Sequence, residues 1–184
     1  MAIKSQIENR NFLSPVGFKF ILTRTPKVSF FANTANIPSI SMGNATQSTY
    51  LKDIPIPGDK PDYGDFTLRF IVDENLENYM QIHNWIRGLG YPESLKEIFD
   101  LQTEEQKGAP LRETFGMDIY SDGTLQVLSS NYRPQFNVVF RDMFPVDLSA
   151  LDFDATNNDI EYFTAEVTFK YTIYNIEDTE GNRL

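Results

Sequence analysis

The sequence predicts a mainly β protein of the α+β class: an antiparallel β-sandwich or barrel with one flanking helix. Segments in which apolar and polar residues alternate recur along the 184-residue chain, and alternation with a period of two is typical of half-buried strands. Only one segment, residues 73–90, changes to helical spacing. No strand–helix unit repeats, which disfavours a parallel sheet with crossover helices. The length suits a single domain with its own core.

Several segments alternate or are rich in strand-forming residues. They are 16–24, 27–34, 65–72, 135–144 and the short segment STYLKD at 48–53. STYLKD is bracketed by proline and glycine, so residues 37–64 are expected to combine a short strand with long loops. Asp122-Gly123 stands between two apolar runs, which predicts a hairpin turn because both residues tolerate positive φ.

The clearest strand prediction is IEYFTAEVTFKYTIYNI, residues 160–176. One face of this strand would carry Phe163, Ala165, Val167, Phe169, Tyr171 and Ile173. The opposite face would carry Thr164, Glu166, Thr168, Lys170 and Thr172. Successive side chains of a strand point to opposite sides, so the first face is expected in the core and the second outside it.

One helix is predicted directly after the strand at 65–72. Asp73 and Asn75 are N-cap candidates, and Gly88 and Gly90 are expected to end the helix. An apolar face at helical spacing is formed by Leu76, Tyr79, Met80, His83 and Ile86, widened by Ile82, Trp85 and Leu89. We expect Tyr79, His83, Trp85 and Ile86 to be packing residues, with the helix closing one end of the barrel.

No catalytic, cofactor-binding or metal-binding residues are predicted. The chain has one histidine and no cysteine, too few nitrogen and sulfur ligands for a zinc site. It contains no nucleophile-elbow, phosphate-loop or dinucleotide-binding motif. Asp152 and Asp154 resemble the start of a calcium loop, but the glycine and the terminal glutamate of such a loop are missing. These observations argue against an enzyme and against a bound cofactor.

The charge of the chain restricts its partners. Sixteen basic and twenty-six acidic residues give a formal net charge of −10, which repels nucleic acid phosphates and anionic lipid surfaces. No apolar run is long enough to cross a bilayer, and the N-terminal sequence lacks the apolar region of a signal peptide. Specific DNA binding and membrane anchoring are therefore not expected.

Two parts of the chain resemble the tail tube proteins of contractile-tailed bacteriophages. The first is GDKPDYGDFTLRFIVDENLENYMQIHNWI, a glycine-containing turn, a strand, an acidic turn and a helix. The second is the late strand in NNDIEYFTAEVTFKYTIY. The matching residues are Phe66, Leu68, Phe70, Asp73, Glu74, Tyr79 and Trp85, then Asn158, Ile160, Phe163, Val167, Thr168, Phe169 and Tyr171. The resemblance covers residues 55–90 and 130–174.

The resemblance implies a virion structural protein made in the host cytoplasm. It implies subunits that form hexameric rings, rings that stack into a tube for DNA ejection, and contacts with sheath and baseplate proteins. A ring of the baseplate or of the tail end would use the same fold, so the position along the tail stays open. A soluble β-barrel that binds a ligand or acts as an enzyme is the more distant alternative.

The expected organisation follows from the same segments. Residues 1–14 would form an extended N-terminal arm, residues 15–178 one domain with a surface excursion at 91–117, and residues 179–184 a C-terminal tail. A conduit for DNA should not hold phosphates, and a wall without a track of basic residues suits that task. The polar face at residues 164–172 is therefore the candidate lumen surface, although the same face would also suit burial against a neighbouring subunit.

Overall fold

The computed structural model describes residues 13, 17–25, 28, 32–98, 101, 119–153 and 162–184. The elements, in chain order, are β1 (Phe18–Leu22), β2 (Ala32–Ala35), β3 (Ile40–Ser48), β4 (Asp53–Tyr63), β5 (Phe66–Ile71), α2 (Glu77–Gly90), β6 (Ser121–Leu128), β7 (Pro134–Leu148), β8 (Thr164–Lys170) and β9 (Ile173–Glu177). Every strand pairing is antiparallel, which confirms the predicted fold class.

In the described part of the chain, no helix has the length and apolar character to cross a membrane. The predicted N-terminal arm, except Leu13, and most of the predicted excursion at 91–117 lie outside the described residues.

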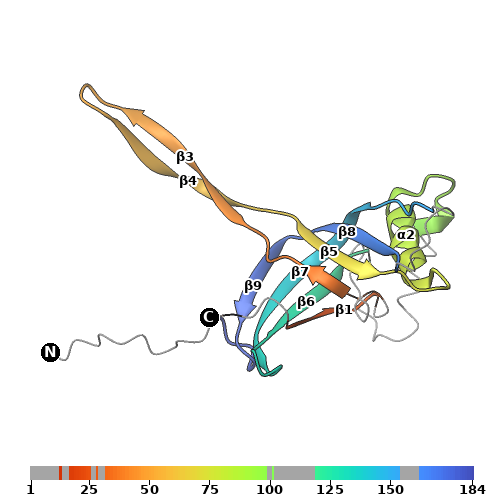
Figure 1. The fold of residues 1–184 in the computed structure, drawn as a ribbon. Coiled ribbons are helices and arrows are strands. Elements are labelled where there is room, and N and C mark those ends of the chain that lie inside the picture. Colours follow the sequence, from red (N-terminus) through yellow and green to blue (C-terminus); the bar gives the residue numbers. More distant parts are fainter. Residues whose placement is uncertain are drawn as a thin grey trace.

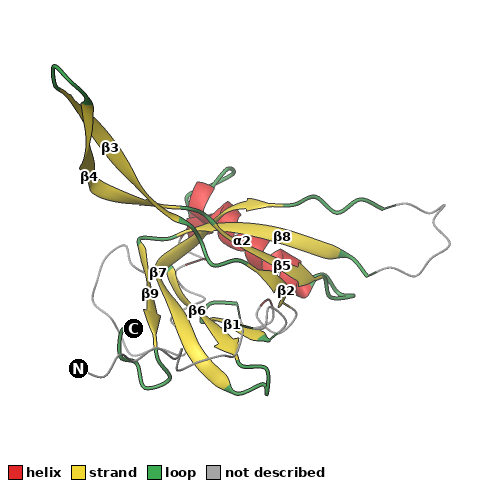
Figure 2. Cartoon of the chain, turned by 60° about the vertical axis from the view of Figure 1, so that its left-hand side comes forward, coloured by secondary structure: helices red, strands yellow, loops and turns green. Residues whose placement is uncertain are grey.

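The long strand β7 belongs to both layers of the fold (Figures 1 and 2). Its first part pairs with β6 on one side and with β9 on the other, and β1 extends this layer beyond β6. Its last part pairs with β8, which continues through β5 to β2. A strand that passes from one sheet to the other is a common way to join the two layers of a β-sandwich.

The core lies between the two layers, and phenylalanine is its most frequent residue. Phe20 of β1 and Phe140 of β7 contact Phe66 of β5, with ring centroids 5.1 and 4.6 Å away. The fully buried large side chains are Trp85, Phe20, Phe66, Phe70, Phe140, Phe169, Leu22, Leu68, Ile82, Met143, Val28 and Val138. Burying a side chain of this size stabilises a fold by about 1.5–3 kcal/mol before entropic costs. The alternation read from the sequence thus places the core correctly in β1, β5, β7 and β8.

The predicted N-cap of the helix was wrong. Leu76 occupies the cap position in a left-handed conformation, with φ 58°, and makes no side-chain cap hydrogen bond. The buried side chain of Asn78 organises this end instead. Its Oδ1 accepts hydrogen bonds from the backbone N–H groups of Asp73 and Tyr79, at 3.1 and 2.8 Å, and its Nδ2 donates to the carbonyl of Ile71 at 2.8 Å. Caps usually come from the residue just before a helix, so the prediction considered only residues there. A capping side chain inside the helix has no spacing signature in the sequence, and Asn78 was therefore missed.

The buried face and the end of the helix agree with the prediction only in part, at Ile82, Trp85 and Gly90. The buried residues are Asn78, Ile82, Trp85 and Gly88, whereas Met80 is exposed. Gly88 does not end the helix: a Cβ there would stand 2.8 Å from Leu101 Cδ2, so glycine permits a close contact. Gly90 is the last helical residue, and Tyr91 takes the left-handed position after it. The face of the helix that packs against the core is therefore centred on Ile82 and Trp85, and Met80 lies outside this face.

The hairpin turn predicted at Asp122-Gly123 is not present. Both residues lie inside β6, and the chain turns into β7 at residues 129–133. A Cβ on Gly123 would stand only 2.4 Å from Met143 Sδ, and the register with β7 shifts between Ser121 and Gly123. Glycine at this position permits close packing in an irregular part of the strand, which the sequence cannot distinguish from a turn.

The single strand predicted for residues 160–176 is two strands with a bend between them. β8 pairs with β5 and β7, and after Tyr171 and Thr172 the chain continues as β9, which pairs with β7 in the other layer. The backbone N–H of Thr172 donates to the carbonyl of Arg141 at 3.0 Å. Alternation continues through the bend in the sequence, so the change of layer was not visible there. Residues 154–161 lie outside the described part of the chain.

Candidate functional site

The most prominent feature of the surface is a two-stranded hairpin, β3–β4, that projects from the sandwich (Figures 1 and 2). Among the described residues, β3 and β4 pair only with each other. All nine residues of β3 are exposed, and in β4 only Gly58 and Tyr63 are partly buried. The segment STYLKD forms the tip of the hairpin and not a short strand of its own, so that prediction was wrong. The prolines that suggested loops are compatible with β4 because no further strand in the described part of the chain covers either edge of the hairpin.

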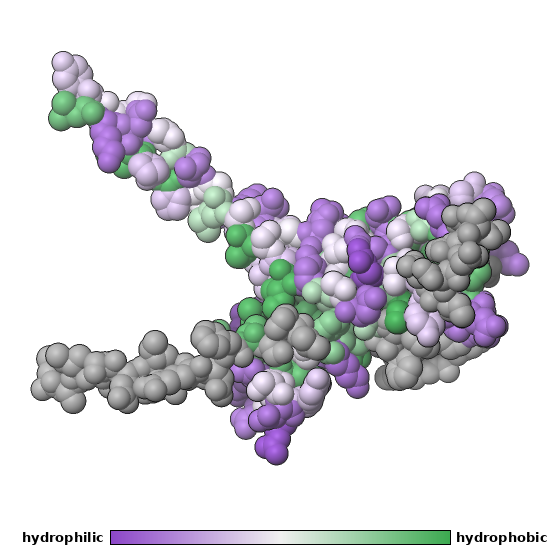
Figure 3. Space-filling view, viewed as in Figure 1, coloured by the Kyte–Doolittle hydropathy of each residue, from purple (hydrophilic) through white to green (hydrophobic). Residues whose placement is uncertain are grey.

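The hairpin exposes apolar side chains along its length (Figure 3). At the tip, Leu51 is 90% exposed. The other exposed large apolar residues of the hairpin are Ile40, Met42, Tyr50, Ile54 and Ile56. A two-stranded hairpin is marginally stable in water on its own, and exposed apolar residues gathered on one element mark an interaction surface. The sequence contained a signal for this surface, the alternation Ile-Pro-Ile-Pro at 54–57, which we interpreted as loop.

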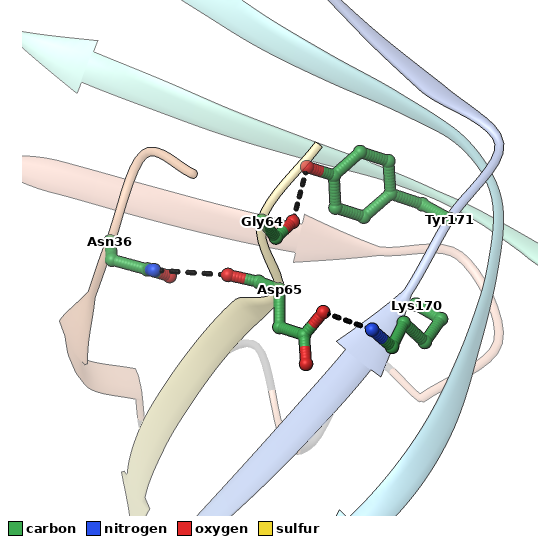
Figure 4. Close-up of polar contacts among 5 residues, drawn as sticks. All are labelled: Asn36, Gly64, Asp65, Lys170 and Tyr171. Carbon is green, nitrogen blue, oxygen red and sulfur yellow. Dashed lines mark hydrogen bonds and ion pairs between the residues drawn. The ribbon is translucent and has the colours of Figure 1, made fainter. Parts of the chain in front are cut away.

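The root of the hairpin is fixed to the bend between β8 and β9. The hydroxyl of Tyr171 donates to the carbonyl of Gly64 at 2.7 Å, and the hydroxyl of Tyr174 donates to the carbonyl of Pro38 at 3.1 Å. Lys170 and Asp65 form an ion pair (Figure 4). The bend and the residues next to it in β8 and β9 therefore hold both strands of the hairpin where they leave the sandwich.

Further contacts connect the two sides of the root to each other. Asn36 donates from Nδ2 to the carbonyl of Asp65 at 3.1 Å (Figure 4), and its Oδ1 accepts from the backbone N–H of Thr67 at 2.7 Å. The N–H of Gly64 donates to the carbonyl of Ser39 at 2.9 Å, and a Cβ on Gly64 would stand 2.7 Å from Ser39 Oγ. These bonds fix the direction in which the hairpin leaves the body.

Aromatic rings surround the root from the core side. Tyr63 contacts Tyr171 and Tyr174 edge-on, with centroids 6.4 and 5.5 Å away, and Tyr171 contacts Phe140 at 5.1 Å. Burial raises the pKa of the Tyr171 hydroxyl well above its ordinary value of 10.0, with smaller contributions from Tyr174 and Asp65. The neutral hydroxyl is therefore strongly favoured in the folded protein, as its role as a hydrogen-bond donor requires.

Four of the five residues of the predicted polar face lie on β8. Thr164, Glu166, Thr168 and Lys170 alternate with the buried residues of this strand, while Thr172 lies in the bend. Both charged residues of this face are paired with β5 or the turn before it: Glu166 with Arg69 at 3.1 Å, and Lys170 with Asp65. Each basic group on this surface thus has a carboxylate beside it.

The helix residues singled out from the sequence occupy different environments. Trp85 is buried, and its Nε1 donates to the carbonyl of Ile119 at 2.9 Å while Arg24 lies over its ring at 5.1 Å. Tyr79 and Ile86 are partly buried against the core, and the hydroxyl of Tyr79 donates to the carbonyl of Ser149 at 3.1 Å. His83 is partly buried, and its Nδ1 has no hydrogen-bond partner among the described residues.

Among the described residues, no group of three or more His, Cys, Asp or Glu side chains is arranged to hold a metal ion. Asp154, which with Asp152 resembles the start of a calcium loop, lies outside those residues. What the described chain does present is a β-sandwich, an anchored hairpin with exposed apolar side chains, and a surface of paired charges. These features are typical of the class of structural subunits that associate through a projecting hairpin.

The chain belongs to the phage tail tube protein family, whose model matches residues 4–177. This is a family of structural proteins, not of enzymes. The family resemblance seen in the sequence is therefore confirmed, and the enzyme alternative is set aside. A comparison with curated protein sequences found no match.

Solved structures of injection-system tubes share the fold. A chain of the "PVC sheath-tube complex in extended state" of an extracellular contractile injection system matches with a TM-score of 0.57 and 17% identity, covering 97% of this chain and 100% of that chain. A chain of the anti-feeding prophage cap, described as "AFP tube terminating cap", matches with a TM-score of 0.58 and 16% identity, covering 97% and 100%. A chain of the anti-feeding prophage baseplate matches with a TM-score of 0.55 and 10% identity, covering 97% and 99%. At these identities the likeness concerns the fold.

Proposed function

We propose that this chain builds the tube of a contractile tail by assembling into hexameric rings that stack on one another. The observation that carries the proposal is the β3–β4 hairpin, whose exposed apolar side chains have no cover in the described part of the subunit. A tube subunit meets its neighbours as further copies of itself, and burial of this hairpin against them would supply the apolar area that stable association needs.

The partners follow from the proposed place in the tail. The relatives of similar fold come from structures described as a sheath-tube complex and a baseplate, and we infer sheath and baseplate contacts for this chain as well. The protein would then be part of the virion. DNA would pass through the tube during ejection without being bound specifically.

The polar face of β8 is our candidate for the lumen. On this face Arg69 and Lys170 are each paired with a carboxylate, Glu166 and Asp65. A paired guanidinium or ammonium group has less attraction for phosphates than a free one, and each phosphate contact avoided removes a salt-dependent hold on the DNA. A wall of hydroxyls and paired charges therefore suits passage of a polyanion.

A terminal or baseplate ring is the second candidate. The fold matches a tube-terminating cap and a baseplate chain about as well as it matches a tube chain, with TM-scores of 0.58, 0.55 and 0.57. The two candidates differ in how far assembly proceeds. A tube subunit adds rings without a fixed end, whereas a cap or baseplate ring stops after one layer or a few.

Light scattering over a concentration series, combined with negative-stain microscopy, tests the proposal. Association into rings that lengthen into tubes supports a tube subunit, and discrete single rings support a cap or baseplate ring. Deletion of the tip residues 49–52 should reduce association without unfolding the subunit, because the tip contributes nothing to the core. A wild-type protein that stays monomeric at every concentration would refute both candidates.

A further inference from the structure

The two edges of the β3–β4 hairpin have different chemistry. β3 has the sequence ISMGNATQS, with no charged residue and no proline. β4 has the sequence DIPIPGDKPDY, with three prolines and four charged residues. Natural proteins protect exposed strand edges with proline and charge, because a bare edge pairs with other chains. In this hairpin one edge carries such protection and the other does not.

The register shows which backbone groups face outward. An antiparallel ladder alternates between pairs that exchange hydrogen bonds and pairs whose N–H and C=O groups turn away from the partner strand. Hydrogen bonds connect Thr49 to Lys52 at the tip, and Gly64 to Ser39 at the root. Counting from either end, the pairs Thr46–Pro55 and Met42–Pro61 belong to the outward class. Prolines at these positions cost the hairpin no internal bond.

The two edges therefore differ in the backbone N–H donors that they offer to an incoming strand. On the β4 edge, Pro55, Pro57 and Pro61 stand at outward positions and offer no N–H to an incoming strand. On the β3 edge, the register partners of these prolines are Thr46, Asn44 and Met42, which all keep their N–H. A strand that docks on β3 finds a backbone donor at each of these three residues, although the register with β4 shifts between Met42 and Asn44, and one that docks on β4 finds no donor at the three prolines.

We propose that the β3 edge is the strand-pairing edge of the hairpin and that it receives a free strand edge of a second copy of this chain. The inference rests on the proposed self-assembly and adds which edge pairs. The charge of the chain favours the same surface: copies with a net charge of −10 repel one another, and the uncharged β3 edge is a part of the hairpin where two copies can approach without like charges facing each other. The prolines of β4 restrict the pairing to one side.

A proline at residue 46 tests the proposal. Thr46→Pro removes one outward N–H from β3 but no bond to β4, so the subunit should fold with an unchanged circular dichroism spectrum and unfolding midpoint. The concentration needed for assembly should rise by about tenfold or more. Thr46→Ala is the matched control, which alters the side chain and keeps the N–H, and it should assemble like the wild type. Equal assembly of the two variants would overturn the proposal.

A second variant tests whether the prolines of β4 prevent strand pairing on that edge. Pro55→Thr combined with Pro57→Thr returns two outward donors to the protected edge. This variant should form sheet-rich aggregates that bind thioflavin T under conditions where the wild type does not. A double variant as soluble as the wild type would contradict the role of the prolines. If wild type and Thr46→Ala both fail to assemble, the proposed self-assembly is wrong, and the aggregation of the double variant still reports on the β4 edge.

Discussion

The hydroxyl of Tyr171 lies 2.7 Å from the carbonyl oxygen of Gly64 and donates a hydrogen bond to it. This bond connects the bend between the two sheets to the root of the projecting hairpin. The strands on either side of the bend also contact the root, through Lys170 at the end of β8 and Tyr174 in β9. The direction of the hairpin therefore depends on a strand that is distant from it in the sequence.

The protein should lose stability at alkaline pH partly through Tyr171. Burial raises the pKa of this hydroxyl above its ordinary value of 10.0, so the unfolded chain loses the proton first. The contribution to stability is complete below pH 10.0 and decreases as the pH rises through and beyond that value. Tyr171→Phe should make the decrease in the free energy of unfolding less steep. Urea titrations on both sides of this pH measure it, with Tyr132→Phe, at an exposed turn, as the control. An unchanged slope in Tyr171→Phe would contradict the assignment.

Ile56→Asp should abolish or strongly weaken assembly and leave the subunit folded. Ile56 is exposed on the hairpin, so the free energy of unfolding should change by less than about 0.5 kcal/mol. A buried, unpaired carboxylate in a subunit interface costs far more. Ile56→Val keeps the apolar character and should assemble normally. The comparison is made by sedimentation of concentrated samples, and assembly of the aspartate variant at the wild-type concentration would exclude this face of the hairpin from the interface.

The helix should act through packing. Trp85→Ala should lower the free energy of unfolding by about 3–5 kcal/mol, because a fully buried indole and its hydrogen bond to Ile119 are lost. His83→Gln should change the free energy of unfolding by about 1 kcal/mol or less and should not alter assembly of the protein that remains folded. Chemical denaturation and light scattering on the same samples separate the two effects. A His83→Gln variant that folds normally but cannot assemble would show a role beyond packing.

The paired charges of β8 should limit DNA binding. Assembled wild-type material should bind double-stranded DNA at low salt no better than an inert protein of the same charge. Glu166→Gln removes the carboxylate beside Arg69 and should increase salt-dependent DNA retention if this face lines the lumen. Glu180→Gln changes the net charge equally at an exposed site of the C-terminal turn and serves as the control. Filter binding gives the readout, and equal retention by the two variants would argue that the face lies elsewhere.

The fold class could be predicted from the sequence, but the contacts between residues that are distant in the sequence could not. Alternation in β1, β5, β7 and β8 predicts their buried faces because each buries one side against the other layer. The bend at Tyr171 and Thr172 and the packing role of Gly123 depend on partners in β7, and no local pattern encodes those partners. The capping role of Asn78 was missed for another reason: its partners Ile71, Asp73 and Tyr79 are close in sequence, but a capping side chain inside the helix has no spacing signature.

The functional surface was harder to predict than the core. Neither strand of the β3–β4 hairpin has a face buried in the core, so its sequence lacks the alternation that marks a buried face. The prolines of β4 are also residues that are common in loops. The family resemblance rested on residues 55–90 and 130–174, which include most of β4 but none of β3 and not the tip of the hairpin. A surface whose partner is another molecule leaves little periodic signal in its own chain.

An electron cryomicroscopy density map of the assembled protein would show directly whether the hairpin mediates assembly. We expect sixfold rings in which the β3–β4 hairpin of each subunit is buried against another copy, with its apolar residues covered. A map in which the rings form while the hairpin remains exposed to solvent would contradict the role assigned to the hairpin. A protein that forms no ring or tube at any concentration would contradict self-assembly itself.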